Sequence, residues 1–295
     1  MSGTVLVTGA GGFVGRQAVA ALTARGFTVH AAARTPPPDD TVVWHRADLL
    51  YGAARVALLD TVRPSHLLHL AWETRHGYFW SAPSNPAWTE ATLDLLRRFR
   101  HSGGGRAVLA GSCAEYDWST EALGYGDCHE TETPRRPATA YGQAKLATFE
   151  AASSEARASG LGLAWGRLFL LYGPHEGEAR LVPSIIRAML AGELATLNDP
   201  AAMRDFLHVA DAGAAFAALL ASDVAGPVNI ASGKGVTITD VARMIGVDIS
   251  AGESSPSPAR LVADVSRLRG EVGFTPRYDL ESGLADTVAW WRATL

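Results

Sequence analysis

Tyr141 and Lys145 are the residues best suited to acid–base chemistry, and they stand four positions apart in Tyr141-Gly-Gln-Ala-Lys145. On a helix, residues at this spacing lie on one face, about a turn apart. A phenol with a pKa of about 10 exchanges protons poorly at neutral pH, but a nearby ammonium can lower that pKa by about 1 to 3 units. The pair can therefore donate or accept a proton. Ser112, at the end of the run Leu109-Ala-Gly-Ser112, offers a hydroxyl that can hold a carbonyl or alkoxide oxygen.

A glycine-rich loop, Thr8-Gly-Ala-Gly-Gly-Phe-Val-Gly15, follows the first apolar run. Glycine at three of its positions allows a tight turn, a close approach of backbone to a pyrophosphate and close helix–strand packing. The start of the next helix then presents free N–H groups to phosphates. A glycine pattern alone is weak, but its place between first strand and first helix favours a dinucleotide site. The predicted contacts are Gly9, Gly12, Phe13, Val14 and Gly15.

The end of the second apolar run indicates which dinucleotide is bound. A free ribose 2′-hydroxyl calls for Asp or Glu about 20 residues after the loop. Here Ala33 holds that place and Arg34 follows, a side chain suited to a 2′-phosphate. We therefore predict NADP(H) as the preferred cofactor, with NAD(H) as the alternative. Asp48 and Leu49, after the third run, are placed to meet the adenine.

These residues must be positioned by alternating strands and helices. Six short apolar runs are predicted strands: Thr4–Val7, Thr28–Ala32, Val42–Trp44, His66–Leu70, Ala107–Ala110 and Gly162–Phe169. The segments with apolar residues at helical spacing are Phe13–Arg25, Gly52–Val62, Trp88–His101 and Ala140–Ala158. Strands that alternate with helices predict an α/β fold with a doubly wound parallel sheet, whose ligands bind at the strand carboxyl ends.

The pattern changes after residue 173. Helices are predicted at Val182–Ala191, Val209–Ser222, Ile238–Ile245 and Ser282–Thr294, with a strand at Pro227–Ile230. We divide the chain into a dinucleotide-binding domain with the catalytic residues, 1–173, and a smaller substrate-binding lobe, 174–295, interleaved with the first. A cleft between such lobes is the expected place for a small ligand.

Composition excludes several classes of protein. The 295 residues carry 26 Lys and Arg against 30 Asp and Glu, a net charge of −4 that argues against a nucleic-acid binder. Two cysteines are too few for a disulfide framework or a cysteine-ligated zinc site, and we expect no metal. No apolar stretch reaches the roughly 20 residues that span a bilayer, and no export signal precedes the first strand. A cytoplasmic protein without nucleic-acid or membrane partners is predicted.

Taken together, these motifs resemble the extended short-chain dehydrogenase/reductase family, of the NAD-dependent epimerase/dehydratase type acting on nucleotide sugars. The resemblance covers nearly the whole chain and implies a Rossmann-like fold. It rests on the Thr8–Gly15 loop, Asp48-Leu49, His69-Leu70-Ala71, Asn85, Ser112, Tyr141 with Lys145, Arg167–Pro174 and Arg204–Val209.

The resemblance also implies a role for each matching residue. Tyr141 would exchange the proton on a sugar hydroxyl or carbonyl, Lys145 would bind the nicotinamide ribose and tune Tyr141, and Ser112 would orient the substrate. Leu70 and Ala71 would line the cofactor site, and Arg204 would face the nucleotide-sugar pyrophosphate. Further candidate substrate contacts are Arg75, His76 and Tyr78 after the fourth strand, and Cys113 and Glu115 after the fifth. The segment Trp72–Trp80 can equally be a lid packed by its own aromatic residues.

Departures from the family pattern narrow the reaction. Dehydratases place Asp and Glu directly after the Ser or Thr, whereas this chain has Cys113 and Ala114, which argues against dehydration. Two usual diphosphate contacts are missing, at Leu170 and at Ser254-Ser255, and Arg180 or Arg260 could substitute for them.

From these observations together we predict an NADP-preferring enzyme that reduces a keto group, at C4, on a nucleotide-linked deoxyhexose. One alternative is a nucleotide-sugar 4-epimerase that retains its NAD(P). The other is a non-catalytic dinucleotide-binding regulator, against which the intact Ser112, Tyr141 and Lys145 argue. A homodimer is expected, because the helices at Trp88–His101 and Ala140–Ala158 match those that pair in family dimers.

Overall fold

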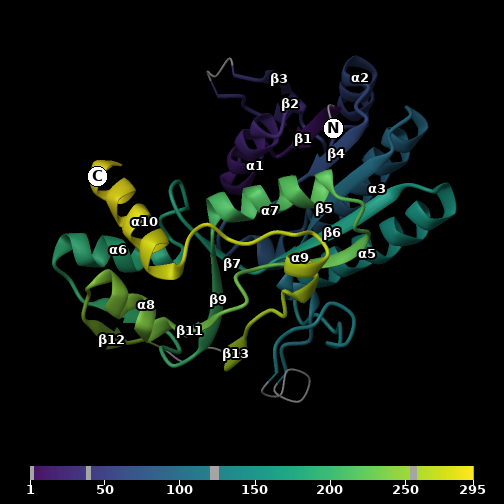
Figure 1. Ribbon diagram of the computed structural model, residues 1–295. Coiled ribbons are helices and arrows are strands. Elements are labelled where there is room, and N and C mark those ends of the chain that lie inside the picture. Colours follow the sequence, from purple (N-terminus) through teal and green to yellow (C-terminus); the bar gives the residue numbers. More distant parts are fainter. Residues whose placement is uncertain (1–2, 38–40, 120–125, 253–257, 295) are drawn as a thin grey trace.

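Seven parallel strands form the central sheet of the computed structural model, which describes residues 3–37, 41–119, 126–252 and 258–294 (Figure 1). Their order across the sheet is β10-β6-β5-β4-β1-β2-β3. The strands are β1 (Thr4–Thr8), β2 (Thr28–Ala33), β3 (Val43–Arg46), β4 (His66–His69), β5 (Arg106–Ser112), β6 (Gly162–Leu168) and β10 (Gly226–Ile230). The predicted α/β fold with a Rossmann-like doubly wound parallel sheet is confirmed.

Helices cover both faces of this sheet. α1 (Phe13–Ala24) and α7 (Val209–Ala221) share one apolar core with the sheet, and α2 (Gly52–Val62), α3 (Asn85–His101) and α5 (Ala140–Ser159) share another. The central strand β1 is therefore buried on both sides, which explains its continuous apolar run. Among the described residues, no helix is both long and apolar enough to cross a bilayer.

The sequence sets the ends of α5, which carries Tyr141 and Lys145. Thr139 accepts a hydrogen bond from the Gly142 N–H at 3.0 Å, which caps the first turn. The helix ends at Gly160, whose φ of 67° lies in the left-handed region. Tyr141 therefore stands in the first turn of α5, next to the carboxyl end of β5.

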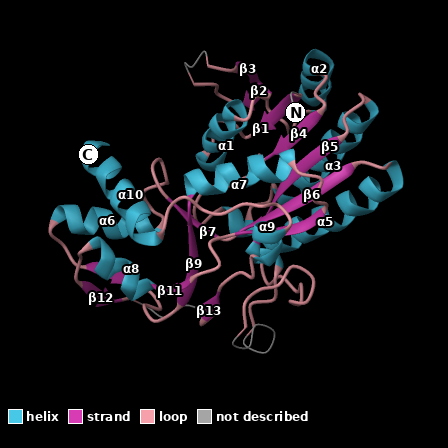
Figure 2. Cartoon of the chain, viewed as in Figure 1, coloured by secondary structure: helices cyan, strands magenta, loops and turns pink. Residues whose placement is uncertain are grey.

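A second, smaller lobe lies beside the sheet (Figure 2). β9 (Met203–His208) pairs with β7 (Leu170–Tyr172), β11 (Gly235–Thr237) and β13 (Arg260–Leu261), and β8 (Ala195–Leu197) pairs with β12 (Ile249–Ala251). Around a separate apolar core pack α6 (Leu181–Ala191), α8 (Ile238–Ile245) and α10 (Leu280–Thr294). The remaining short elements are η1 (Phe79–Ser81), η2 (Cys113–Glu115) and α9 (Ser266–Gly270).

One feature of this lobe was not predicted. The strand β9 was not predicted, because its charged residues Arg204 and Asp205 are not typical of a buried strand. Asp205 can be buried because its carboxylate accepts hydrogen bonds from the N–H groups of Ser232 and Gly233. The parts of the chain on either side of residue 173 share the central sheet. α7 and β10 follow this residue in sequence, yet α7 packs on the sheet and β10 completes the sheet beside β6.

Candidate functional site

The glycine-rich loop is folded tightly at the carboxyl edge of the sheet. Gly9 has a φ of 69°, and a Cβ atom on it would lie 2.8 Å from the Ala71 nitrogen. A Cβ on Gly15 would lie 2.1 Å from the Gly9 carbonyl oxygen. Only glycine fits at these two positions, and the loop consequently places the start of α1 beside the end of β4. The structure thus brings the predicted Gly9 to Gly15 loop together with Leu70 and Ala71, in an arrangement that fits a dinucleotide pyrophosphate.

The residues predicted to select the cofactor lie on the neighbouring strand ends. The Ala33 Cβ is 3.5 Å from the position of a Cβ on Gly11, so Ala33 faces the loop where a carboxylate would meet a ribose. Arg34 is exposed, and its charge contributes to lowering the pKa of Glu73. Asp48 accepts a hydrogen bond from the Leu50 N–H at 3.1 Å, and Leu49 is buried.

Lys145 is buried next to the carboxyl end of β5. Its Nζ donates a hydrogen bond to the Ala110 carbonyl oxygen at 3.0 Å. The same atom lies 3.7 Å from the ring centroid of Trp72 and 5.9 Å from that of Tyr141. Burial lowers the pKa of Lys145 to about 7. The predicted pairing of Tyr141 and Lys145 on one helix face is present in the structure.

Ser112 and Tyr141 meet at the end of β5. The Ser112 hydroxyl accepts a hydrogen bond from the Ala114 N–H at 3.2 Å and also contacts the Tyr141 side chain, which lowers the pKa of that phenol. Burial has the larger effect and raises the pKa of Tyr141 well above its usual value. The phenol of the cofactor-free protein is therefore protonated at neutral pH and can act as a proton donor.

Aromatic side chains enclose Tyr141. The sequence did not predict which residues of the 72–80 segment would contact it. The ring centroids of Phe79, Trp80 and Trp72 lie 4.9, 5.8 and 6.4 Å from that of Tyr141, each ring nearly perpendicular to it. Trp118 in turn lies 6.0 Å from Trp80. The density of aromatic residues between 72 and 80 was the available signal. This segment packs against Tyr141, whose side chain is half-buried.

The remaining candidates of that segment lie at its exposed edge. Arg75 forms an ion pair with Glu73 at 3.0 Å, and its guanidinium lies 4.2 Å from the Tyr78 ring centroid. His76 is exposed, and its pKa is lowered by partial desolvation and, to a smaller extent, by the charge of Arg180. These side chains are exposed to solvent.

Arg180 connects the second lobe to the site. It precedes α6, and its guanidinium lies 5.3 Å from the Phe79 ring centroid and donates a 3.5 Å hydrogen bond to the Thr74 carbonyl oxygen. Its charge also lowers the pKa of Tyr141. Leu170 lies in β7, whereas Ser254 and Ser255 lie outside the described residues.

Cys113 and Arg204 approach each other from the two lobes. Burial raises the pKa of the Cys113 thiol, and the charge of Arg204 opposes that rise. Arg204 is 6% exposed and donates hydrogen bonds to the carbonyl oxygens of Met203 and Pro258. A buried thiol with a raised pKa is a poor base.

Glu115 does not line the pocket, which corrects its predicted role as a substrate contact. It is fully buried behind the site, where it forms a 2.7 Å ion pair with Arg167. It also accepts hydrogen bonds from the Trp165 indole at 2.9 Å and the Ser112 N–H at 2.8 Å. Both of its carboxylate oxygens accept hydrogen bonds from protein groups, so Glu115 positions Ser112 instead of touching a ligand. Its burial depends on β6, which the sequence around Glu115 does not reveal.

Sequence reasoning also missed Glu176, which lies between β7 and α6. Its Oε2 is buried and has no hydrogen-bond partner within the described residues. Burial raises the pKa of Glu176 to about 8, against the opposing charge of Arg180. A carboxyl group that is neutral near pH 7 can donate as well as accept a hydrogen bond in this part of the cleft.

The lowered pKa of Lys145 predicts a pH-dependent stability. The unfolded chain holds this proton up to a pKa of about 10.4, whereas the folded chain releases it near 7. At this group the unfolded state therefore binds more protons across the window, and the contribution of Lys145 to the free energy of unfolding should rise with pH from about 7 to 10. Lys145→Met should flatten that slope in denaturant titrations at several pH values. An unchanged slope would place the ammonium in a more solvated environment.

Comparison with known proteins agrees with this geometry. Residues 5–231 match the model of the NAD dependent epimerase/dehydratase family. The chain is 28% identical to a dTDP-4-dehydro-6-deoxy-D-allose reductase from Streptomyces bikiniensis, over 98% of this chain and 96% of that protein. It is 27% identical to a UDP-glucose 4-epimerase from Corynebacterium glutamicum, with the same coverage.

Solved structures give the same result. The complex of MoeE5 with UDP-glucuronic acid and NAD superposes with a TM-score of 0.84 at 30% identity, covering 99% of this chain and 100% of that one. The Thermus thermophilus UDP-glucose 4-epimerase in complex with NAD has a TM-score of 0.87 at 25% identity, with the same coverage. The chain therefore belongs to the NAD dependent epimerase/dehydratase family, within the extended short-chain dehydrogenases/reductases.

Proposed function

We propose that this enzyme reduces a keto group, at C4, on a nucleotide-linked deoxyhexose, with NADP(H) as the preferred cofactor. A nicotinamide dinucleotide supplies a hydride when it is bound. The protein's own contribution is a proton and the alignment of the carbonyl. The carbonyl carbon gains the hydride, its oxygen gains a proton, and an alcohol results.

Three side chains divide this work. The Ser112 hydroxyl, fixed at the end of β5 by the Ala114 N–H, holds the carbonyl oxygen. The Tyr141 phenol contacts Ser112 and donates its proton to the same oxygen. Lys145, whose Nζ binds the Ala110 carbonyl oxygen, is positioned to bind the nicotinamide ribose and to stabilise the tyrosinate that proton transfer leaves behind.

The observation that carries this proposal is the convergence of Ser112, Tyr141 and Lys145 at the carboxyl end of β5. Reduction of a carbonyl needs a proton donor, which the Tyr141 phenol supplies. Oxidation of a sugar hydroxyl, the first step of an epimerase, needs a base at the same place, so this geometry serves both reactions. Cys113 and Ala114 after Ser112 offer no acid–base pair for the elimination of water, so a dehydratase is not favoured.

A 4-epimerase is the second candidate, and the similar proteins support it equally. The relatives include both a reductase and a UDP-glucose 4-epimerase at nearly the same identity. Both reactions use the same hydride and proton positions. They differ in whether the sugar is released after one hydride transfer or presents its other face for a second.

Cofactor consumption separates the two reactions. The protein is incubated with a 4-keto-6-deoxy nucleotide sugar and NADPH, and in parallel with a 4-hydroxy nucleotide sugar without reduced cofactor. A reductase oxidises one NADPH for each alcohol formed, and absorbance together with chromatography measures both. Formation of the C4 epimer without added reduced cofactor would establish the epimerase instead.

Arg34 provides a test of the cofactor preference. Charge-assisted hydrogen bonds to the 2′-phosphate contribute about 1.5 to 3 kcal/mol each, so losing one should weaken NADPH binding roughly ten- to a hundredfold. NADH has no such phosphate. Arg34→Ala should therefore weaken NADPH alone, and adding Ala33→Asp, next to the loop at Gly11, should reverse the preference.

Titration of both cofactors against each variant measures this effect. Arg25→Ala, an exposed arginine at the other end of α1, is the matched control and should change neither affinity. Equal affinity of the wild type for NADH and NADPH would refute the NADP preference.

A further inference from the structure

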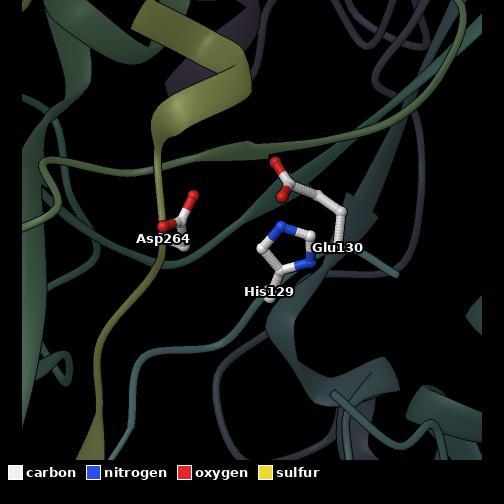
Figure 3. A group of neighbouring side chains, drawn as sticks. All are labelled: His129, Glu130 and Asp264. Carbon is white, nitrogen blue, oxygen red and sulfur yellow. The ribbon is translucent and has the colours of Figure 1, made fainter. Parts of the chain in front are cut away.

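Outside the site described above, three side chains with metal-ligand atoms converge: His129, Glu130 and Asp264 (Figure 3). One ligand atom from each lies within 4.8 Å of the other two. Figure 3 shows a ring nitrogen of His129 directed toward the two carboxylates. The residues come from segments far apart in sequence, one following η2 and the other following β13.

Backbone hydrogen bonds hold these two segments together. The Cys128 N–H donates to the Val262 carbonyl oxygen at 2.7 Å, and the Asp264 N–H donates to the Cys128 carbonyl oxygen at 2.9 Å. The Asn229 side-chain amide donates to the carbonyl oxygens of both Cys128 and Asp264, at 2.8 and 3.0 Å. The main chain consequently holds His129 and Asp264 next to each other, independently of any contact between their side chains.

Glu130 supplies a separate indication that something is bound here. Its side chain is fully buried, and one carboxylate oxygen accepts a 2.9 Å hydrogen bond from the Asn229 N–H. The other oxygen, Oε2, is buried without a hydrogen-bond partner among the described residues. Burying a carboxylate oxygen without a partner is costly, and a cation is one way to compensate it. His129 and Asp264 are only partly buried, which leaves a route from solvent.

We propose that His129, Glu130 and Asp264 bind one divalent cation of the zinc type. Two carboxylates and a neutral imidazole carry a charge of −2, which matches a divalent ion. A nitrogen ligand beside two oxygens suits Zn²⁺ better than Mg²⁺ or Ca²⁺, which prefer oxygen ligands alone. Water would complete a fourth position.

The geometry requires a small adjustment. Bonds of about 2.0 to 2.2 Å in a tetrahedral site place ligand atoms about 3.4 Å apart, so the three atoms, now within 4.8 Å of one another, must approach by up to about 1.4 Å. Rotation of the two partly buried side chains, His129 and Asp264, can provide this movement.

Neighbouring groups support the ligands. His129 Nδ1 accepts a 3.4 Å hydrogen bond from the Thr131 N–H and lies 3.2 Å from Thr131 Oγ1. Metal binding at Nε2 would move the ring proton to Nδ1, where Thr131 Oγ1 can accept it. The Ser266 N–H and hydroxyl donate to the two Asp264 oxygens at 2.9 and 3.2 Å. His129 and Arg267 are the positive groups that act on Glu130, and the Arg267 guanidinium forms a 2.8 Å ion pair with Glu271. The cation would thus link the two segments and stabilise their junction with β10.

Isothermal titration of the tag-free, metal-stripped full chain with Zn²⁺ tests the site. We expect saturable binding of one ion, and a rise in Tm of about 5 °C at a Zn²⁺ concentration near 100 times Kd. His129→Gln and Asp264→Asn should each weaken Zn²⁺ binding at least tenfold. Glu132→Gln, an exposed carboxylate two positions from Glu130, is the matched control and should leave Kd unchanged.

Dinucleotide binding by each variant checks that it is folded, since the glycine-rich loop lies on other elements. A wild type that binds no Zn²⁺, or binds Mg²⁺ as tightly, would overturn the proposal. So would folded His129→Gln and Asp264→Asn variants that bind Zn²⁺ as the wild type does, because the ion would then sit elsewhere. None of these readouts depends on the reaction catalysed.

Discussion

Replacing Tyr141 by phenylalanine is expected to lower kcat by about 10²–10⁴-fold, the contribution typical of a positioned acid or base. The substitution removes one hydroxyl and keeps the ring that Phe79, Trp80 and Trp72 enclose. Packing and the cofactor loop should therefore be unaffected. Steady-state kinetics measure the loss of rate, and cofactor titration should give an unchanged Kd.

Tyr51→Phe is the matched control for this experiment. Tyr51 is 69% exposed and lies between β3 and α2, and β3 is at the edge of the sheet, four strands from β5, so its hydroxyl should contribute nothing to the rate. Wild-type turnover by Tyr141→Phe would show that another group supplies the proton. Glu176, a buried carboxyl with a raised pKa, would then be the next residue to test.

Glu115→Gln is expected to lower the free energy of unfolding by about 3–5 kcal/mol, because it leaves a buried charge without its counterion. Arg167 is completely buried, and Glu115 is the carboxylate that pairs with it. Glutamine keeps the size of the side chain and one acceptor oxygen but cannot neutralise the guanidinium. Chemical denaturation should show the loss as a lower midpoint.

The ion pair between Arg97 and Glu155 provides the control for this prediction. It has the same N–O distance, 2.7 Å, but its side chains are 53% and 33% exposed. Exposed pairs contribute about 0–1 kcal/mol, so Glu155→Gln should change the midpoint little. If the two variants lost equal stability, burial would not be the source of the strength of the Glu115 pair. Since Glu115 also binds the Ser112 N–H, Glu115→Gln should slow turnover as well.

Local spacing in the sequence was sufficient to predict the parts of the site that depend on neighbouring residues. The Gly9 to Gly15 loop forms between β1 and α1 because its turn needs residues without side chains. Tyr141 and Lys145 share a face because they stand four apart on a helix whose cap, Thr139, is two residues upstream. The alternation of strands and helices likewise predicted the parallel sheet, since each apolar run is short enough to be one strand.

Only the tertiary structure decided which polar residues are buried and what they face. Glu115 follows Ser112 by three positions and was expected to line the pocket. It is instead buried in an ion pair with Arg167, 52 residues later. Trp72 contacts Lys145 across two different elements, and β10 joins the sheet from beyond residue 173. The free energy of a charged or aromatic side chain depends on the partners and the solvent around it. Those partners come from distant segments, so local sequence patterns do not predict them.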